Sequence, residues 1–358
     1  MEIAVTGLPA SGKSTVFAAL AGRSLPSAEQ SRRGESPRAV VKVPDPRVDA
    51  LAEMFRPRKV TPAEVQYVAA PELTHAGRTT EGWSTLLTQL RQADAIMLVC
   101  RAFDEPSCPH PKGSVDPVRD VVEMQSELLL ADMIAIERRL ERLEREARSG
   151  AKAQQVQERD LLARFKERLE TGQPLRGLEI SSAERKLLGG FGFLTLKPVL
   201  LVANIGPGGL DGSAATLARE AESLDASYLS LDGKLERELV ELEPAEQAEM
   251  LRAFGLAEPA LARAIRASYS LLDLISFFTV GEDEVRAWTV KRGAQAPEAA
   301  GVIHSDLQRG FIRAEVVPAA DLLRLGGLAE ARRQGLLRSE GKTYVVQDGD
   351  VMNVLFNV

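Results

Sequence analysis

The sequence predicts an α/β domain that is interrupted by a long helical hairpin and followed by a compact, mostly β domain. Three observations lead to this prediction. Apolar runs alternate with helical patterns near the start of the chain, as in a parallel sheet wrapped by helices. A highly charged stretch from Val118 to about Leu188 carries leucine and isoleucine at helical spacing. After Phe277, short β-like runs replace the helical pattern.

The strands of the α/β domain are predicted where apolar runs are short and are followed by turn or helix signals. They are Glu2–Thr6, Ala39–Val43, Val65–Ala70, Ala95–Val99, Pro198–Ala203 and a short one near Tyr228–Leu231. The hairpin lies between the fourth and fifth strands, with its turn near Ser149-Gly150, and helical signals resume from Leu235 to Leu272. In the β domain the predicted elements are the strands Phe277–Val280, Val285–Val290, Phe311–Val317, Thr343–Val346 and Val351–Phe356, and a helical piece at Glu298–Leu307.

Composition restricts the class of protein. A chain of 358 residues is long for one core, so two or three domains are expected. The formal net charge is −6, so a nucleic-acid partner would have to meet a local basic patch. No apolar run approaches membrane-spanning length and no basic leader precedes the first strand, so we expect a soluble, cytoplasmic protein with no membrane partner.

The two cysteines, Cys100 and Cys108, build neither a disulfide framework nor a zinc spacing. Ordinary thiols in a reducing compartment are the expected state. A metal site that includes the nearby His110 is the minor alternative.

A G-x-x-x-x-G-K-S motif spans Gly7 to Ser14, directly before a helical pattern. Its glycines permit a tight turn whose backbone N–H groups, from Leu8 to Ser14, point at one anion, and the following helix adds positive potential. Lys13 is expected to reach the outer phosphates, and the Ser14 hydroxyl to ligate Mg²⁺. We therefore predict a purine nucleotide, ATP/ADP or GTP/GDP, with Mg²⁺; a glycine-rich turn without a ligand is the alternative. The predicted binding residues of this motif are Gly7, Pro9, Ala10, Ser11, Gly12, Lys13, Ser14 and Thr15.

Residues 138–168 carry ten Arg or Lys against six Asp or Glu, so the hairpin is net basic inside an acidic protein. This makes it a candidate RNA-facing surface. A solvated coiled-coil face with many charge pairs explains the same composition. The basic stripe in question consists of Arg138, Arg139, Arg142, Arg145, Arg148 and Lys152.

Several longer phrases run through the chain almost from end to end. They are Val43–Arg47 followed by Asp49–Ala52, Lys112–Asp120, Lys197–Leu200 leading to Asn204, and, in the tail, Glu284–Thr289, Gly293–Pro297, Val302–His304, Gly310–Glu315 and Val346–Val351. Together they resemble the YchF or Obg-like ATPase family of P-loop proteins. The resemblance implies a GTPase-like P-loop NTPase domain at residues 1–117 and 190–274 and an inserted coiled coil at 118–189. It also implies a ubiquitin-like β-grasp (TGS) domain at 275–358. Cytosolic nucleotide hydrolysis, often favouring ATP, and association with the ribosome or another RNA-rich surface are implied as well, without sequence-specific DNA binding.

The sequence departs from the family pattern where the outer phosphate is expected. Members end the third strand in Asp-x-x-Gly, and Ala69 and Glu72 occupy those places here. Ala69 offers no oxygen for magnesium chemistry, while Glu72 brings negative charge near the phosphates. Leu73 is compatible with the hydrophobic residue that the family carries in place of a water-positioning glutamine.

Two further departures concern the preceding loop and the base. Residues 32–37 supply no threonine to close over Mg²⁺; a hydroxyl from Ser31 or Ser36, or arginines that meet the phosphates, are alternatives to a merely solvated loop. Asn204 is retained as a predicted nucleotide-binding residue. Pro207 stands where GTPases carry the carboxylate that reads guanine, so the main reason to prefer guanine is absent.

These features together predict a purine-nucleotide-binding regulator, associated with the ribosome or RNA, whose hydrolysis is slow or lost and for which no catalytic residue is assigned. One alternative is an active ATPase or GTPase of this type with compensating residues elsewhere. Another is a scaffold that binds no nucleotide. A protein partner that docks on the β-grasp sheet is the alternative to RNA.

Overall fold

The computed structural model describes residues 1–22, 36–71, 80–148, 152–206 and 213–357. Internal contacts divide the chain into two units. The first consists of Met1–Ala39 and Gln66–Ala264, and the second of Val40–Val65 and Ile265–Val358. Within the described ranges no helix is both long enough and apolar enough to cross a membrane.

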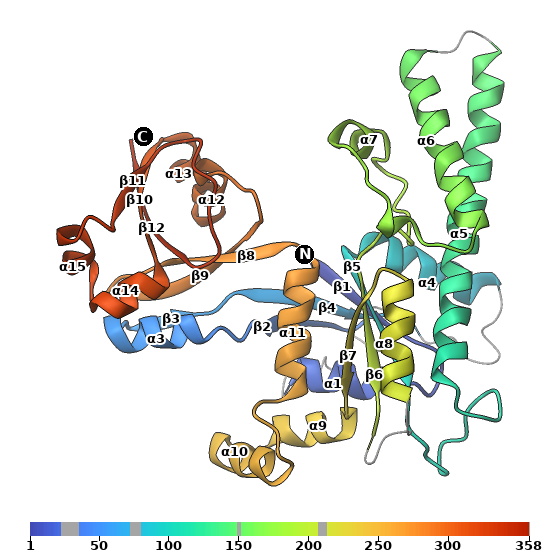
Figure 1. Cartoon of the computed structure of the whole chain (residues 1–358), viewed down its shortest axis with the longest axis horizontal. Helices are drawn as coiled ribbons and strands as arrows, with labels where there is room; N and C mark the ends of the chain where they lie inside the picture. The colour runs from blue at the N-terminus through green and yellow to red at the C-terminus, as the bar shows by residue number, and fades with distance from the viewer. Residues whose placement is uncertain (23–35, 72–79, 149–151, 207–212, 358) are drawn as a thin grey trace. The chain divides into compact units, whose positions relative to one another are not determined.

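A six-stranded sheet in the order β2-β4-β1-β5-β6-β7 organises the first unit (Figure 1). Its strands are β1 Glu2–Thr6, β2 Arg38–Lys42, β4 Glu64–Ala69, β5 Ala95–Arg101, β6 Val199–Asn204 and β7 Ser227–Leu231. β1 pairs in parallel with β4 on one side and with β5 on the other, so the strand order reverses at β1. In open parallel sheets, ligands bind at the carboxyl ends of the strands at such a reversal. The fold therefore places a site after β1, where the P-loop motif lies.

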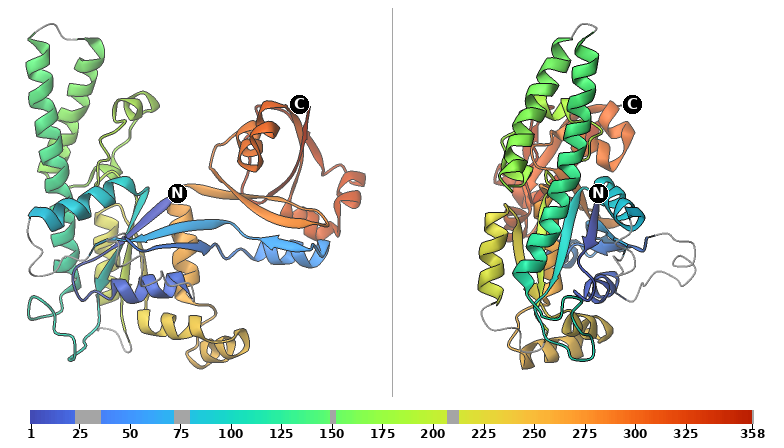
Figure 2. Two further views of the ribbon diagram at one scale, coloured as in Figure 1. Left: turned by 180° about the vertical axis from the view of Figure 1, so that it is seen from behind. Right: turned by 90° about the vertical axis from the view of Figure 1, so that its right-hand side faces the viewer.

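Helices cover both faces of this sheet (Figure 2). The helices described between β1 and β8, apart from α3, are α1 Lys13–Ala21, α4 Thr80–Gln92, α5 Pro117–Ala147, α6 Ala153–Glu170, α7 Ser182–Leu187, α8 Ser213–Ser223, α9 Gly233–Glu241, α10 Pro244–Ala253 and α11 Ala260–Leu271; not all of them lie on the sheet. α4, α5 and α8 contribute to one core through the buried Leu90, Met124 and Leu217. α1 packs against β1 and β5, and α9 packs against α1.

The predicted hairpin is formed by α5 and α6, which pack side by side (Figure 1). Its own core contains Ile136 and Leu143 of α5 and Leu162 and Phe165 of α6, all buried. Leucine and isoleucine at helical spacing thus build the contact that the sequence predicted. The expected turn at Ser149-Gly150 lies outside the described residues.

The fully buried carboxylate of Asp132 ties α5 to the segment that leads into β6. It accepts hydrogen bonds from the backbone N–H groups of Leu194 and Thr195, at 2.9 and 2.8 Å, and from the Thr195 hydroxyl at 2.8 Å. Burial raises the pKa of Asp132, although these hydrogen bonds act in the opposite direction. Three donors therefore depend on one side chain.

The second unit is built on a six-stranded sheet in the order β11-β10-β12-β8-β9-β3. Its strands are β3 Lys59–Thr61, β8 Leu274–Thr279, β9 Glu284–Lys291, β10 Phe311–Pro318, β11 Arg338–Glu340 and β12 Asp350–Phe356, and its helices are α3 Pro46–Phe55, α12 Ala296–Ile303, α13 Ser305–Arg309, α14 Ala319–Leu325 and α15 Leu328–Arg333. β8 and β9 form an antiparallel hairpin, α12 packs on the sheet, and β12 returns parallel to β8. This arrangement is a β-grasp fold.

One predicted strand of this unit is wrong. Thr343–Val346 forms only an isolated bridge between Val345 and Gln295, and the described strand nearby is β11. β11 is three residues long and consists of Arg, Ser and Glu, so no apolar alternation marks it in the sequence.

Residues 40–65, which the resemblance assigns to the P-loop domain, include α3 and β3, and both contact C-terminal elements. β3 pairs in parallel with β9, and α3 is fixed by Arg47. The Arg47 guanidinium lies 2.9 Å from the Asp348 carboxylate and 5.2 Å from the centre of the Phe278 ring. α3 and β3 therefore group with the second unit by their contacts, whereas β2 and β4, at the two ends of this segment, belong to the first sheet.

Candidate nucleotide-binding site

The loop between β1 and α1 has the backbone geometry of an anion-binding turn. Ala10 and Gly12 both adopt left-handed conformations, with φ of 63° and 85°. A Cβ atom on Gly12 would lie 2.1 Å from Asn204 Nδ2, so only glycine fits there. Gly12 is also the N-cap of α1 and makes no side-chain capping bond. The start of α1 therefore offers its backbone N–H groups to an anion at this loop.

Two buried polar side chains belong to the same loop. Lys13 is 5% exposed, and its ammonium donates to the Ala70 carbonyl at 3.2 Å. Ser11 is 3% exposed, and its hydroxyl has no hydrogen-bond partner among the described residues. A buried hydroxyl without a partner is costly, so an acceptor from a ligand would fit beside it.

A cavity of about 310 Å³ opens at this loop, lined by Gly7 through Thr15 together with Phe103, Glu105 and Cys108. All eight predicted P-loop residues thus lie at one cavity. The structure brings together Gly7, Pro9, Ala10, Ser11, Gly12, Lys13, Ser14 and Thr15.

Asn204 lies beneath the loop instead of lining that cavity. Its Nδ2 donates to the Ser11 carbonyl at 3.1 Å, and its Oδ1 accepts from the Gly233 N–H at 3.0 Å. The side chain is buried and connects the P-loop to the start of α9. This contact supports the shape of the loop.

The end of β4 carries no acidic side chain where the family pattern has one. Ala69 is the last residue of the strand, and its N–H donates to the Pro37 carbonyl at 2.8 Å. Glu72 and Leu73 lie outside the described residues, as do Ser31, Arg32 and Arg33. The next residue, Ala70, offers its carbonyl to Lys13.

A second cavity, of about 560 Å³, lies at the carboxyl ends of β6 and β7. Its lining includes Ile205, Gly206, Leu231, Asp232 and Lys234. The Asp232 carboxylate caps α9 by accepting from the N–H groups of Lys234 and Leu235, at 2.9 and 3.2 Å. This carboxylate is therefore already engaged, while Pro207 and Asp211 lie outside the described residues.

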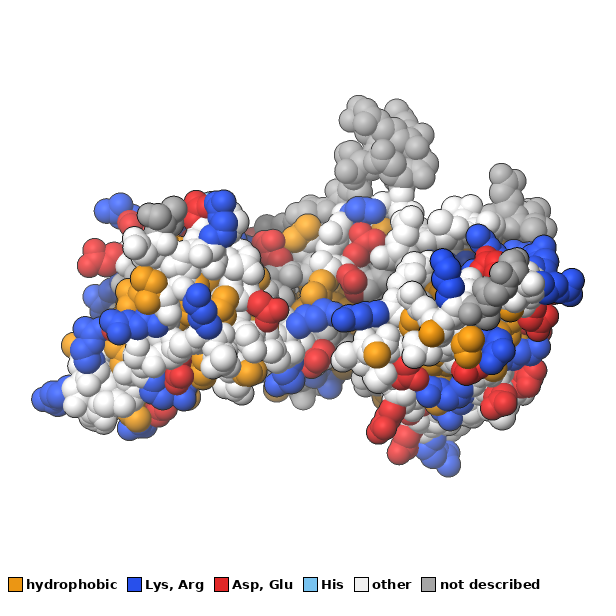
Figure 3. Space-filling model, turned by 90° about the horizontal axis from the view of Figure 1, so that it is seen from above, with side chains coloured by type: hydrophobic (Ala, Val, Ile, Leu, Met, Phe, Trp, Pro, Cys, Tyr) orange, Lys and Arg blue, Asp and Glu red, His pale blue; other side chains and the backbone are white. Residues whose placement is uncertain are grey.

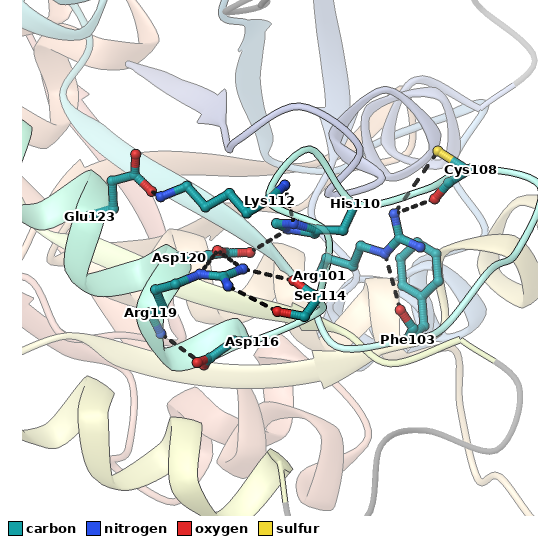
Figure 4. Close-up of polar contacts among 10 residues, drawn as sticks. All are labelled: Arg101, Phe103, Cys108, His110, Lys112, Ser114, Asp116, Arg119, Asp120 and Glu123. Carbon is teal, nitrogen blue, oxygen red and sulfur yellow. Dashed lines mark hydrogen bonds and ion pairs between the residues drawn. The ribbon is translucent and has the colours of Figure 1, made fainter.

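The loop after β5 contains polar contacts that the sequence analysis missed (Figure 4). His110 and Asp120 are both buried, with His110 Nε2 2.8 Å from the carboxylate, and His110 Nδ1 accepts from the Lys112 N–H at 3.1 Å. In the sequence, the only signal for this pair is that a histidine and an aspartate follow the apolar run of β5 within twenty residues.

The predicted minor alternative of a metal site with the cysteines is not supported by the geometry. Across the described ranges, no group of three or more His, Cys, Asp or Glu side chains is placed to hold a metal. Cys100 is buried and Cys108 is exposed. Burial raises the pKa of the Cys100 thiol to about 12.

The reversal of strand order at β1, the P-loop and the β-grasp unit together define a GTPase-like P-loop NTPase with a C-terminal β-grasp domain. The YchF-GTPase_C family, described as a protein of unknown function (DUF933), matches residues 274–357. A Bacillus subtilis protein named "Ribosome-binding ATPase YchF" is 40% identical over 99% of this chain and 98% of its own length. A protein of the same name from Escherichia coli O157:H7 is 38% identical over the same shares. The structure of the Schizosaccharomyces pombe YchF GTPase is similar with a TM-score of 0.85 and 29% identity, over 99% of this chain and 97% of that one. The chain therefore belongs to the YchF family, as its sequence phrases predicted.

Proposed function

We propose that the chain is a purine-nucleotide-binding regulatory protein of the ribosome, in which NTP hydrolysis is slow or lost. The observation that carries the proposal is the P-loop cavity at the first turn of α1. It is lined by the buried Lys13 and by Ser11, whose buried hydroxyl has no hydrogen-bond partner in the described part of the chain. The phosphates would accept from the N–H groups of Leu8 to Ser14 and from Lys13. Two relatives that are named ribosome-binding ATPases support the class of ligand and the partner.

The described residues of this site offer a magnesium ion one side-chain ligand and no acidic group at position 69. Ser14 is in the first turn of α1 with an exposed side chain, so its hydroxyl would be the protein ligand. Mg²⁺ takes its other ligands from phosphates and water in such sites. The ion would neutralise phosphate charge, while Ala69 supplies no side-chain oxygen to order its water shell.

We expect hydrolysis to be slower than about 1 per second, the lower end for typical kinases. Phosphoryl transfer depends on positioning and on charge stabilisation around the metal, and the acidic residue of the family pattern is replaced by Ala69. Restoring Ala69→Asp together with Glu72→Gly should raise either the rate of phosphate release or the magnesium-dependent affinity for triphosphate. Ala69→Asn with Glu72→Gly is the matched control without the charge.

A parent protein that turns over at about 1 per second or faster would contradict slow hydrolysis. The second candidate function, an active ATPase or GTPase with compensating residues, would then be preferred. The names of the relatives, ATPase in bacteria and GTPase in Schizosaccharomyces pombe, are the observation in its favour.

Base preference should lean to adenine or be weak. The carboxylate that accepts two guanine N–H groups is replaced by Pro207, and a contact of this kind contributes about 1.5 to 3 kcal/mol, or roughly ten- to a hundredfold in affinity. Calorimetric titration with ADP, ATP, GDP and GTP measures this directly, and it also tests whether the chain binds nucleotide at all. A strong preference for GTP would show that another carboxylate reads the base. Asp232→Asn, which keeps an N-cap side chain, would then identify or exclude Asp232.

The hairpin is proposed to meet ribosomal or other RNA, with help from the C-terminal domain. The structure shows that part of the basic stripe is already paired: Arg139 makes two hydrogen bonds to Glu158, at 2.6 and 2.8 Å, and Arg142 lies 2.9 Å from Glu146. Basic and acidic side chains are interspersed on the face drawn in Figure 3. The exposed Arg138, Arg145 and Arg148 therefore carry most of the remaining argument for RNA.

Reversing Arg142, Arg145 and Arg148 to Glu should abolish co-sedimentation with ribosomes at low salt. Contacts to phosphate dominate binding of this kind, so the parent's affinity should fall steeply with salt. Arg219, Arg237 and Arg252, which are exposed on α8, α9 and α10, provide a control triple with the same change of charge. If the hairpin variant still co-sediments, a protein partner on the β-grasp sheet becomes the better explanation. If the parent never co-sediments, the hairpin is a structural arm.

A further inference from the structure

Arg101, the last residue of β5, is a buried cation without an anionic partner in the described part of the chain. The residue is 2% exposed and is among the largest fully buried side chains. No described carboxylate lies within 4.0 Å of its guanidinium. A buried guanidinium is costly unless its N–H groups are satisfied, so a specific arrangement has to hold it.

Backbone carbonyls of the following loop supply that arrangement (Figure 4). Nε donates to the Phe103 carbonyl at 3.1 Å, Nη1 to the Cys108 carbonyl at 2.8 Å, and Nη2 to the Glu105 carbonyl at 3.4 Å. The guanidinium carbon also lies 4.6 Å from the centre of the Phe103 ring. The loop from Phe103 to Cys108 is thus fixed from inside at three carbonyls and one ring.

The loop that Arg101 holds is a wall of the P-loop cavity, which Phe103, Glu105 and Cys108 line. The Phe103 ring also reaches the residues after β6. A Cβ atom on Gly206 would lie 2.8 Å from Phe103 Cβ, and one on Gly12 would lie 3.8 Å from Phe103 Cε1. The ring therefore lies where the P-loop meets the residues that follow Asn204.

Arg101 also lies directly behind the P-loop. It lines a cavity of only about 10 Å³ with Leu8, Pro9 and Ser11. A space of that size holds at most one water molecule. The guanidinium is therefore closely packed on this side of the P-loop, with little empty space around it.

We propose that Arg101 is a positioning residue for the nucleotide, which holds Phe103 and the 103–108 loop in place so that the ring contacts the nucleoside of the bound nucleotide. The inference rests on the proposed function. An arginine suits this role because its planar fork bonds several carbonyls at fixed angles while its face stacks on a ring. A lysine would keep the charge without the fork.

The test compares two ligands, ADP and inorganic pyrophosphate, by calorimetry. Arg101→Lys should weaken ADP binding about tenfold and change pyrophosphate binding by less than about twofold, because only ADP carries a nucleoside to meet Phe103. Phe103→Leu should weaken ADP binding similarly. Adding Arg101→Lys to Phe103→Leu should cost little more, since both substitutions act through one ring.

The rate at which iodoacetamide alkylates Cys108 gives a second readout. If Arg101 only stabilised the fold, its substitution would not change how far ADP protects Cys108. Cys108 is exposed while Cys100 is buried, so the reagent reports on the loop. ADP should slow alkylation in the parent, and Arg101→Lys should speed it and weaken the protection. The melting temperature shows whether each variant is folded, and Arg101→Met replaces Arg101→Lys if the lysine variant is not.

If the Arg101→Lys variant and the parent bind ADP equally well, the inference about Arg101 is overturned. The proposed function is then unaffected. Equal losses for ADP and pyrophosphate also overturn the inference, because they place the effect on the phosphates and not on the loop wall. A parent that binds neither ligand overturns the proposed function and the inference together.

Discussion

Lys13→Ala is expected to weaken the binding of a purine nucleoside diphosphate by about 2 kcal/mol or more, or roughly thirtyfold. Lys13 is the charged side chain of the P-loop, buried beside the cavity and positioned by its hydrogen bond to Ala70. The substitution removes a charge-assisted hydrogen bond to phosphate and leaves the backbone amides of the loop in place. Calorimetric titration of parent and variant with ADP measures the difference.

Lys186→Ala is the matched control, because Lys186 is an exposed lysine on α7 of the same unit. It should bind ADP as the parent does. Equal binding by the Lys13 variant and the parent would mean that the loop does not hold phosphate, and the proposed function would fail with it.

Asp132→Ala is expected to destabilise the first unit by about 3 to 5 kcal/mol. The carboxylate is fully buried, and its removal leaves the N–H groups of Leu194 and Thr195 and the Thr195 hydroxyl without their acceptor. In a domain of this size such a loss lowers the melting temperature by roughly 10 °C, which scanning calorimetry resolves. Asp132→Asn, which keeps one acceptor oxygen, should lose less.

Asp160→Ala serves as the control on the same hairpin, since Asp160 is exposed and, among the residues that the structure describes, its carboxylate pairs with Arg159 alone. Its melting temperature should stay close to that of the parent, because exposed ion pairs contribute little. A shift for Asp132→Ala as small as that of Asp160→Ala would show that water replaces the carboxylate at no cost.

Much of the fold was predictable because apolar runs mark the buried strands. β1 was predicted with the bounds that the structure has, and β5 and β6 differ only at their ends, since each is a continuous buried run. β3 and β11 were missed because both are three-residue strands with mostly exposed side chains. Their position depends on partners far away in the sequence, β9 and β10, and a local pattern carries no trace of that.

The candidate site was predicted where a motif encodes it and missed where the fold assembles it. Gly12 and Lys13 are recognisable from spacing alone, because the backbone turn needs glycine and the phosphate needs a cation. Arg101 could not be found this way. Its guanidinium contacts backbone carbonyl groups of the 103–108 loop, and every residue has such a group, so no sequence pattern marks the contact. The position of the Phe103 ring likewise depends on how that loop folds.

The sheet of the second unit is built from two separate stretches of sequence. The matched C-terminal family begins at residue 274, yet β3 and Arg47, which support that sheet, come from residues 40–65. A fragment or gene fusion that starts at residue 274 would leave β9 with an unpaired edge, which invites association with other chains. The six-stranded C-terminal sheet of this chain is therefore not encoded by one continuous stretch of sequence.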